Sequence, residues 1–572
     1  MKHIDCGPRR GVSARSESAI IRAPRRVAAI VACALCAAAL VNPCDAKSRN
    51  IQKNQVVTIA VDAAADRVPI NPLIYGMVLA QPHDVSVLNV PLNVWSGNTT
   101  TDYNWSLDAT NTDNGNFFMS QPKGSLIPGG AADKFVSGNL QAGAQSTLLI
   151  PLAGYVANLG LLRNNLWSFS IAKYGPQCAS SPGQSDAGDG LEPDCKTFIT
   201  GNNPNDAYVA DSVLNEKGWL EHLVGTWGSA ANGGVGYYMM DQEASIWFQV
   251  HRDIHPVGAH ATEYLDKVLA ESQSLKSVDP SAKVVAPEEW GWNGYLCSGY
   301  DQQTSQHHCT QGYDHTQVQG GLDYIPWLLS QWQAAGHPVD VVSVHFFPPL
   351  VYNNDTSQAT ELLRNQSTRL LWDPNYVEPG SWIKTPIDLI PRLQAWVSQY
   401  YYAGTPVALT SYDWGGEDSM NGATAQADIL GIFGREQLGM GARWLSPAEN
   451  TPTYTAVQMY RNYDGAGSTF GDTSVSAQVP QPDNLSAFAA LRTSDGALTL
   501  MVISKVLSGS TPVSVTLANS AASGSATVYR LAASSPTHIQ QMPNVAWSSG
   551  VLSDNEPAQS ITLYVLPQNG PR

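Results

Sequence analysis

The sequence predicts an α/β protein: a (β/α)8 TIM barrel followed by a C-terminal antiparallel β-sandwich that also takes an N-terminal strand. Two observations support this fold class. Between about residue 70 and residue 447, short apolar, β-branched runs alternate with runs of helical period, which is typical of a parallel sheet covered by helices. After about residue 465 the chain is rich in Gly, Ser, Thr and Val, with apolar and polar residues alternating over short distances, as in antiparallel strands.

Residues 1–46 have the features of a secretory signal peptide. Arg22, Arg25 and Arg26 precede an apolar run over residues 27–41, and small residues follow at a plausible cleavage site. The alternative is a single membrane anchor, but the apolar run is shorter than a bilayer-spanning helix requires. We therefore expect a secreted or periplasmic protein that does not contact a membrane after cleavage.

The barrel is expected over residues 70–465, where predicted strands and helices alternate. Leu265, Val268, Leu269 and Leu275 fall on one face of a helix over residues 261–276. A further helix opens at Trp327 and is closed by Gly336 and Pro338. The other strand-like runs are 235–240, 283–286, 339–347, 406–410 and 441–445, and the other helix-like runs are 383–400 and 423–433.

The sandwich is expected over residues 466–572, with strands such as 497–503 and 512–517. The segment 47–69 precedes the barrel, and its stretch 55–60 alternates in the same way, so we expect it to add a strand to the sandwich.

Four cysteines lie outside the predicted signal peptide, and an even number in an exported protein suggests disulfides. Four cysteines allow three pairings, of which we favour the local ones, Cys178 with Cys195 and Cys297 with Cys309. A zinc site is disfavoured because the sequence has no Cys-x-x-Cys spacing there.

The composition excludes some classes of function. The chain carries 32 Lys and Arg against 48 Asp and Glu, a net charge of −16. This balance argues against a nucleic-acid binder, which needs a basic face. The 16 Trp residues are typical either of a cleft that stacks sugar rings or of a large aromatic core.

Functional groups of a barrel lie where its strands end, and four such strand ends carry polar or aromatic residues. Glu243 ends an apolar run between Asp241 and Trp247. It is either a proton donor or a structural carboxylate paired with His251 or Arg252. His345, at a second strand end, either lines the cleft or belongs to the core. The third and fourth strand ends are residues 286–292 and 409–416.

Six stretches in this order resemble glycoside hydrolase family 44, a family of endoglucanases and xyloglucanases with a (β/α)8 barrel and a β-sandwich. They are INPLIYG at 70–76, WSGN at 95–98 with YNW at 103–105, MDQEASIW at 240–247, QSTRLLW at 366–372, NGATAQADILGIFG at 421–434 and NYDG at 462–465. The resemblance runs from about residue 56 to the end of the chain.

The resemblance implies a retaining mechanism in which one Glu is the acid/base and a second Glu is the nucleophile. Glu243 falls on the acid/base position. The nucleophile should stand in a TEYN-like segment, where this sequence has Ser411. The chain also has Val94 where the family usually has Arg, and Gln242 where it has Asn. Losing the carboxylate removes the need for an arginine partner, since a buried Arg without one is costly.

Two rescues of the missing nucleophile are conceivable. Asp413 lies two residues after Ser411 and would act as the base of an inverting reaction with Glu243 as the acid; alternatively, Glu417 reaches in from the following loop. The alternative for both Asp413 and Glu417 is a solvated loop carboxylate without a catalytic role. Ser411 itself is a poor nucleophile because its hydroxyl is neutral at working pH.

These observations lead to a polysaccharide hydrolase acting on β-1,4-glucan or xyloglucan, with a catalytically impaired glycan-binding homologue as the alternative. A surface adhesion protein would leave the long motifs unexplained. We expect a monomer with a polysaccharide partner and no organic cofactor, and the resemblance allows a structural calcium ion. The expected substrate-binding residues are Trp95, Asn98, Tyr103, Trp105, Gln242, Trp247, His345, Tyr412 and Trp414.

Overall fold

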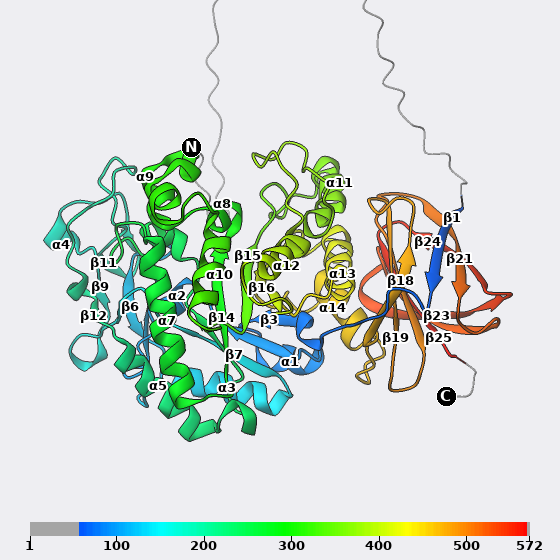
Figure 1. Cartoon of the computed structure of the whole chain (residues 1–572), viewed down its shortest axis with the longest axis horizontal. Helices are drawn as coiled ribbons and strands as arrows, with labels where there is room; N and C mark the ends of the chain where they lie inside the picture. The colour runs from blue at the N-terminus through cyan, green and yellow to red at the C-terminus, as the bar shows by residue number, and fades with distance from the viewer. Residues whose placement is uncertain (1–55, 569–572) are drawn as a thin grey trace, which may run out of the picture. The chain divides into compact units, whose positions relative to one another are not determined.

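The structure, a computed structural model, describes residues 56–568. The predicted signal peptide and residues up to 55 lie outside the described residues. Figure 1 shows the described chain as a helix-covered barrel and a β-rich C-terminal part. No helix within residues 56–568 is both long enough and apolar enough to cross a bilayer.

Eight parallel strands, taken in chain order, close into the predicted barrel. They are β3 (Gly76–Val78), β4 (Leu92–Trp95), β7 (Gln145–Ile150), β13 (Tyr237–Met240), β14 (Lys283–Trp290), β15 (Val341–Phe346), β16 (Val407–Tyr412) and β17 (Met440–Arg443). One cluster of small and branched side chains, including Val94, Leu149, Val285 and Ala408, is contributed by several of these strands. Such residues fill the interior of a barrel.

Each barrel strand is followed by a principal helix, which completes the βα alternation. These helices are α1 (Pro82–Val87), α3 (Gly130–Ala142), α5 (Val213–Trp227), α7 (Ala261–Val278), α10 (Tyr324–Ala334), α12 (Leu389–Tyr400), α13 (Met420–Arg435) and α14 (Pro452–Arg461). On α7 the predicted apolar face is confirmed, because Leu265, Val268 and Leu275 are buried and Leu269 is half-buried against the same core. Further helices are α2 (Asn98–Thr101), α4 (Ile171–Tyr174), α6 (Trp247–Val250), α8 (Gly291–Leu296), α9 (Gly299–Thr304) and α11 (Gln358–Ser367).

Small sheets form in the long insertions that follow β4 and β7. They are β5 (Ala109–Asn111), β6 (Met119–Pro122) and β9 (Leu166–Trp167) in one, β8 (Tyr155–Ala157) and β12 (Tyr208–Ala210) in another, and β10 (Ser180–Ser181) and β11 (Gln184–Gly188) in a third. Both predicted disulfides are confirmed: Cys178 is bonded to Cys195, beside the third sheet, and Cys297 to Cys309.

The C-terminal strands form one closed sheet around its own apolar core. They are β18 (Thr473–Gln478), β19 (Leu485–Leu491), β20 (Leu498–Ser504), β21 (Ser510–Ala518), β22 (Gly524–Ala532), β23 (Ser535–Ser548), β24 (Val551–Pro557) and β25 (Ser560–Leu566). The predicted N-terminal strand is β1 (Val57–Asp62), and the short β2 (Val68–Pro69) pairs with β18.

The purely antiparallel arrangement expected for this sheet needs a correction. β1 pairs antiparallel with β18 but parallel with β21. The closed ring has an odd number of strands, and such a ring cannot alternate direction at every step. One parallel pair is therefore unavoidable, and it falls where the N-terminal strand closes the sheet.

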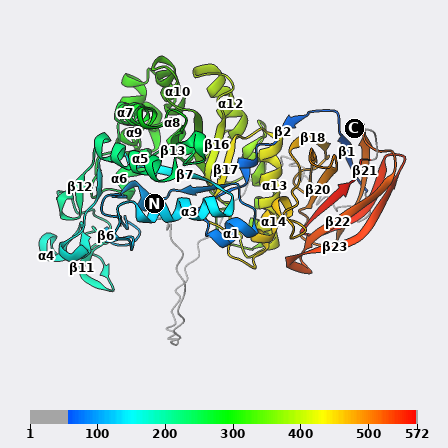
Figure 2. The same ribbon diagram turned by 90° about the horizontal axis from the view of Figure 1, so that it is seen from below.

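Helix α13 packs against strands of the closed sheet, and Figure 2 shows it between the barrel and that sheet. Ser419 caps the helix, its side chain accepting a hydrogen bond from the Gly422 N–H. A Cβ at Gly431 would lie 2.2 Å from the Phe488 ring on β19, so this helix position needs glycine for close approach rather than for its backbone angles. Behind this contact Lys505 and Asp428 form a buried ion pair, Nζ to Oδ2 2.8 Å.

Candidate active site

The loop after β13 and the C-terminal end of β14 bring two glutamates, Glu243 and Glu288, to the carboxyl edge of the barrel. Glu243 has a left-handed backbone (φ 50°), and its N–H donates to the Glu288 carbonyl at 2.9 Å. Asp241 fixes the same loop, because its buried carboxylate accepts hydrogen bonds from Thr101 Oγ1 (2.7 Å) and the Leu152 N–H (2.6 Å). The loop geometry thus sets the position of Glu243 before any ligand binds.

His345, in β15, lies between the two glutamate side chains. Its Nδ1 is 2.7 Å from Glu243 Oε1, and its Nε2 is 3.2 Å from Glu288 Oε2 without an aligned hydrogen bond. The Glu243 side chain is 12% exposed, whereas the other two are essentially inaccessible. Of these three groups, only Glu243 can therefore reach a ligand.

Glu288 is anchored beneath this pair by two hydroxyl groups. Ser343 Oγ donates to its Oε2 at 3.0 Å, and Thr410 Oγ1 donates to the same oxygen. The register between β14 and β15 shifts between Pro287 and Glu289, so Glu288 occupies an irregular position with φ 57°. β-Bulges commonly change the direction of a side chain, and this one directs the Glu288 carboxylate toward His345.

The carboxylates control the protonation of His345. Burial alone would lower the imidazole pKa, but the contacts with Glu243 and Glu288 outweigh it and raise the pKa to about 9. His345 is therefore a cation at neutral pH. Glu289, the next residue after Glu288, behaves oppositely because burial raises its pKa to about 8. It is a neutral acid at pH 7, with its Oε2 3.3 Å from the Ser245 N–H.

Neither partner considered for Glu243 in the sequence contacts it. His251 lies against Asp102, with Nδ1 to Oδ2 3.2 Å. Arg252 donates through Nη2 to the Asp189 carbonyl at 2.6 Å. The predicted alternative, in which Glu243 pairs with His251 or Arg252, is therefore wrong. The observed partner of Glu243 is His345.

The part of the carboxyl edge formed by β16 and β17 carries Ser411, at the position where the resemblance implies the nucleophile. Ser411 is the strand neighbour of His345, next to a register shift that also includes Thr410. Asp413 Oδ1 contacts Arg443 Nη2 at 3.0 Å and accepts from the Gly415 N–H at 3.0 Å. Glu417 Oε2 is 3.4 Å from the same nitrogen. Both acids that were considered as replacements are thus committed to Arg443, which is itself buried.

The expected polar binding residues meet on the β4 side of the edge. Gln242 Nε2 donates to Asn98 Oδ1 at 2.9 Å, and its Oε1 accepts from the Gly97 N–H at 3.0 Å. Gly97 has φ 112°, and a Cβ there would lie 3.1 Å from the Trp444 ring. Trp105 is half-buried and stacks on His222 with ring centroids 5.9 Å apart.

Most of the aromatic residues expected to stack on sugar rings have no free face, and this prediction is wrong for them. Trp247 Nε1 donates to the Gln242 carbonyl, Tyr412 OH accepts from Gln426 on α13, and Trp414 Nε1 donates to Ser367. Trp95 and Tyr103 pack against each other. All five are buried in the core between strands and helices, so they support the site rather than line it.

Half-buried aromatics do occur at the carboxyl ends of β14 and β15. Trp290 and Phe347 lie 5.0 Å apart between ring centroids, and Phe347 and Tyr352 lie 4.8 Å apart. The sequence identified the strand end 286–292, which contains Glu288, Glu289 and Trp290, but assigned no role to these residues individually. Phe347 and Tyr352 were not assigned a role either, although Phe347 ends the strand-like run 339–347.

No group of three or more His, Cys, Asp or Glu side chains in the described part of the chain is arranged to hold a metal ion. The calcium ion allowed by the resemblance stays a prediction.

A parallel barrel whose carboxyl edge presents a histidine-supported glutamate, together with a C-terminal β-sheet domain, agrees with the glycoside hydrolase architecture that the sequence motifs resemble. The family model of glycoside hydrolase family 44 matches residues 97–349. CelM2, a bifunctional glucanase-xylanase from a metagenome library, is 50% identical, with 90% of this chain and 100% of that chain covered and a TM-score of 0.88. The chain belongs to glycoside hydrolase family 44.

More distant relatives agree with this assignment. A Paenibacillus polymyxa xyloglucanase of the same family, solved with xyloglucan, is 27% identical over 90% of this chain and all of that chain, with a TM-score of 0.75. Endoglucanase A of Paenibacillus lautus is 29% identical over 78% of this chain. The chain spans 64% of that relative's length and 38% of the β-mannanase/endoglucanase A of Caldicellulosiruptor saccharolyticus.

Proposed function

We propose that this chain is a secreted or periplasmic glycoside hydrolase that cleaves β-1,4-linked plant polysaccharides such as glucan or xyloglucan. The observation that carries the proposal is the Glu243–His345 pair, with 2.7 Å between oxygen and nitrogen, at the carboxyl ends of β13 and β15. A partly exposed carboxyl group held in position by a buried histidine is able to exchange a proton with a bound ligand, as general acid–base catalysis requires. The glucanase, xylanase and xyloglucanase names of the relatives support the substrate class.

In the proposed reaction, the Glu243 carboxyl group gives its proton to the glycosidic oxygen as the bond to the anomeric carbon breaks. Water then adds to that carbon and loses a proton. Because Ser411 replaces the nucleophile, we propose that water attacks directly, which inverts the configuration. The proton that the water loses goes to solvent, because the Asp413 carboxylate is already held by Arg443 at 3.0 Å.

A second candidate is a family member that binds polysaccharide without cleaving it. Ser411 favours this candidate, because a serine hydroxyl without an activating base does not replace a carboxylate nucleophile. The Trp290–Phe347–Tyr352 row suits binding as well as cleavage.

Hydrolysis of xyloglucan and carboxymethylcellulose by the protein tests the proposal. Glu243→Gln keeps the size of the side chain but removes the acid, and we expect about a 10²–10⁴-fold loss of turnover. Glu417→Gln is the matched control, since Glu417 is a carboxylate on the same edge that contacts Arg443 and the Ala448 N–H. Equal activity of Glu243→Gln and the parent would overturn the role of Glu243. Binding without any cleavage by the parent would favour the second candidate.

A further inference from the structure

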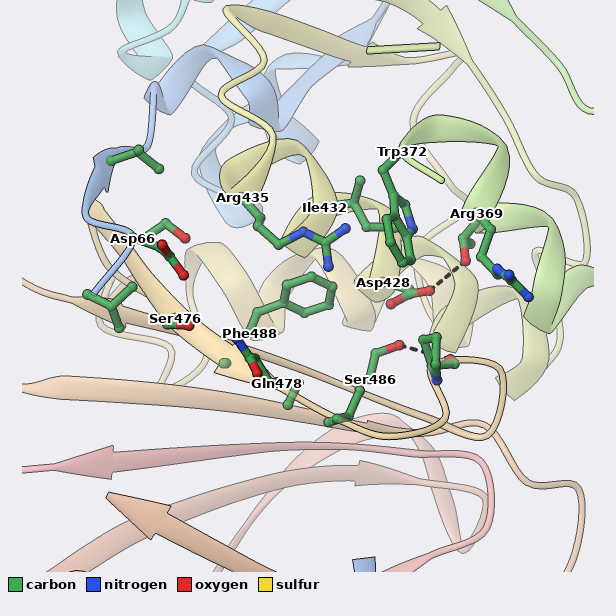
Figure 3. Close-up of a pocket in the computed structure, with 18 of the residues that line it drawn as sticks. Asp66, Arg369, Trp372, Asp428, Ile432, Arg435, Ser476, Gln478, Ser486 and Phe488 are labelled. Atoms are coloured by element: carbon green, nitrogen blue, oxygen red, sulfur yellow. Dashed lines mark hydrogen bonds between the residues drawn. The ribbon is translucent and has the colours of Figure 1, made fainter. Parts of the chain in front are cut away.

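A cavity of about 580 Å³ lies between the barrel and the closed sheet, away from the site described above. Its walls are the η8 turn (Thr368–Leu371), α13, β18 and β19 (Figure 3). Helix α13 begins just after the carboxyl end of β16 and runs back along the barrel to Arg435. A ligand beside Arg435 is therefore at the opposite edge of the barrel from Glu243.

Arg435 is the central polar group of this cavity (Figure 3). Its guanidinium carbon lies 4.4 Å from the centroid of the half-buried Trp372 ring and 5.7 Å from that of Phe488. Its Nε donates to Glu436 Oε1 at 2.7 Å. Its Nη2 is buried and has no hydrogen-bond acceptor among the described residues. A buried donor without a partner is unfavourable, and the Arg435 side chain as a whole is still 36% exposed, so its guanidinium is suited to an acceptor oxygen brought by a ligand.

Each basic side chain that lines the cavity is paired with at least one acid. Lys505 is paired with Asp428, Arg435 with Glu436, and Arg369 with Asp373 and Asp483. Asp66 adds a further acid to the lining. An anionic ligand such as a phosphate would find no uncompensated positive charge here, so the balance favours a neutral ligand.

The remaining lining combines an aromatic ring with hydroxyl and amide side chains. Trp372 contributes the ring, and Ser474, Ser476 and Gln478 come from β18. The volume lies within the range of small-molecule sites. An aromatic ring, several neutral polar groups and one free donor form the combination that recognises a sugar, which has an apolar face and many acceptor oxygens.

We propose that this cavity is a second, non-catalytic binding site for one or two neutral sugar units of a polysaccharide chain. The site would hold the polymer while a different part of it occupies the carboxyl edge of the barrel. The inference rests on the proposed function for its choice of ligand, but it requires binding only and does not require that the chain cleaves.

Calorimetric titration of the full chain carrying Glu243→Gln with cellotetraose and with a xyloglucan oligosaccharide tests this site. We expect two binding events, of which Trp372→Ala and Arg435→Gln each weaken one by about tenfold or more. Trp396→Ala is the matched control, because Trp396 is also half-buried beside an arginine, Arg392, at 5.8 Å, but outside the cavity. It should leave both events unchanged.

A single binding event, or a second event that neither variant changes, would overturn the proposal. Competition by inorganic phosphate for the second event would also overturn it, because it would identify the cavity as an anion site. Arg435→Gln keeps the experiment decisive if Trp372→Ala fails to fold. Hydrolysis by the parent chain is measured separately, so that a failure of this site is distinguishable from a failure of the proposed function.

Discussion

The two halves of the barrel's carboxyl edge hold their acids in different ways. On β13 to β15, Glu243 and Glu288 flank His345, so that two carboxylates share one imidazole. On β16 and β17, Asp413 and Glu417 share the guanidinium of Arg443, while Ser411 stands where the resemblance implies a nucleophile. The first half carries the proposed proton-transfer groups, and the second carries a serine in place of the expected carboxylate. The comparison indicates that these two tasks can be separated within one site.

The largest effect should come from restoring the missing carboxylate. If Ser411 limits turnover, Ser411→Glu combined with Val94→Arg should raise polysaccharide hydrolysis by at least about a hundredfold, since losing a catalytic nucleophile costs several orders of magnitude. The measurement is kcat on xyloglucan, together with the anomer released, which should switch to retention. Ser411→Gln, also combined with Val94→Arg, is the control of similar size without the charge. An equal gain in both variants would show that the change is not nucleophilic.

The second prediction concerns how Glu288 acts through His345. Glu288→Gln removes one of the two carboxylates that raise the imidazole pKa to about 9. A histidine with a raised folded-state pKa contributes stability below its unfolded value, and this stability is lost as pH rises through the folded value. In the variant the loss should begin at lower pH. We expect kcat/KM to fall by about tenfold at pH 8 and less at pH 6, within the usual range of general acid–base effects.

The pH profile distinguishes this positioning role from simple destabilisation. Glu289→Gln is the matched control, since Glu289 is the adjacent buried glutamate but contacts Ser245 rather than His345. If Glu288→Gln lowers activity equally at every pH, Glu288 does not act through His345.

The third prediction separates the two acids on Arg443. Because the Asp413 carboxylate is already committed to Arg443 and the Gly415 N–H, we expect Asp413→Asn to change turnover only a few-fold. It should destabilise the fold by about 1–3 kcal/mol, as expected for loss of a charged hydrogen-bond partner. Chemical denaturation and hydrolysis are measured together, with Glu417→Gln alongside. A loss of turnover above about a hundredfold in Asp413→Asn alone would identify it as the catalytic base.

The fold could be predicted because its signals are local and repeated. The strands β13 to β17 and the helices α7, α10, α12 and α13 follow directly from apolar periodicity. The small sheets of the insertions could not be predicted in this way. Strands such as β10 and β11 have two to five residues in segments rich in Gly, Ser and Asp, where no periodicity can develop.

The site was predicted less well, for geometric reasons. Glu243 and His345 were identifiable because they end apolar runs, but their contact with Glu288 depends on a bulge in β14 that composition does not reveal. The misplaced aromatics have a related cause. Tyr412 is a strand residue whose hydroxyl bonds to helix α13, and which side of a strand faces the ligand cannot be read once a bulge interrupts the alternation.

The smallest effect on turnover is expected from Glu289. This residue tests whether the first half of the edge holds one carboxyl group in its neutral form beside the carboxylates around His345. Burial raises its pKa to about 8, so the folded chain holds a proton there that the unfolded chain releases above its ordinary value of 4.5. Stability should therefore fall as pH rises from about 4.5 to about 8. Glu289→Gln removes this dependence and should stabilise the fold by up to about 5 kcal/mol at pH 9 relative to pH 4, since each pKa unit corresponds to about 1.4 kcal/mol. Denaturation curves of the parent and of Glu289→Gln at the two pH values measure this difference in stability. If the free energy of unfolding of both proteins changes equally with pH, Glu289 is ionised in the folded protein.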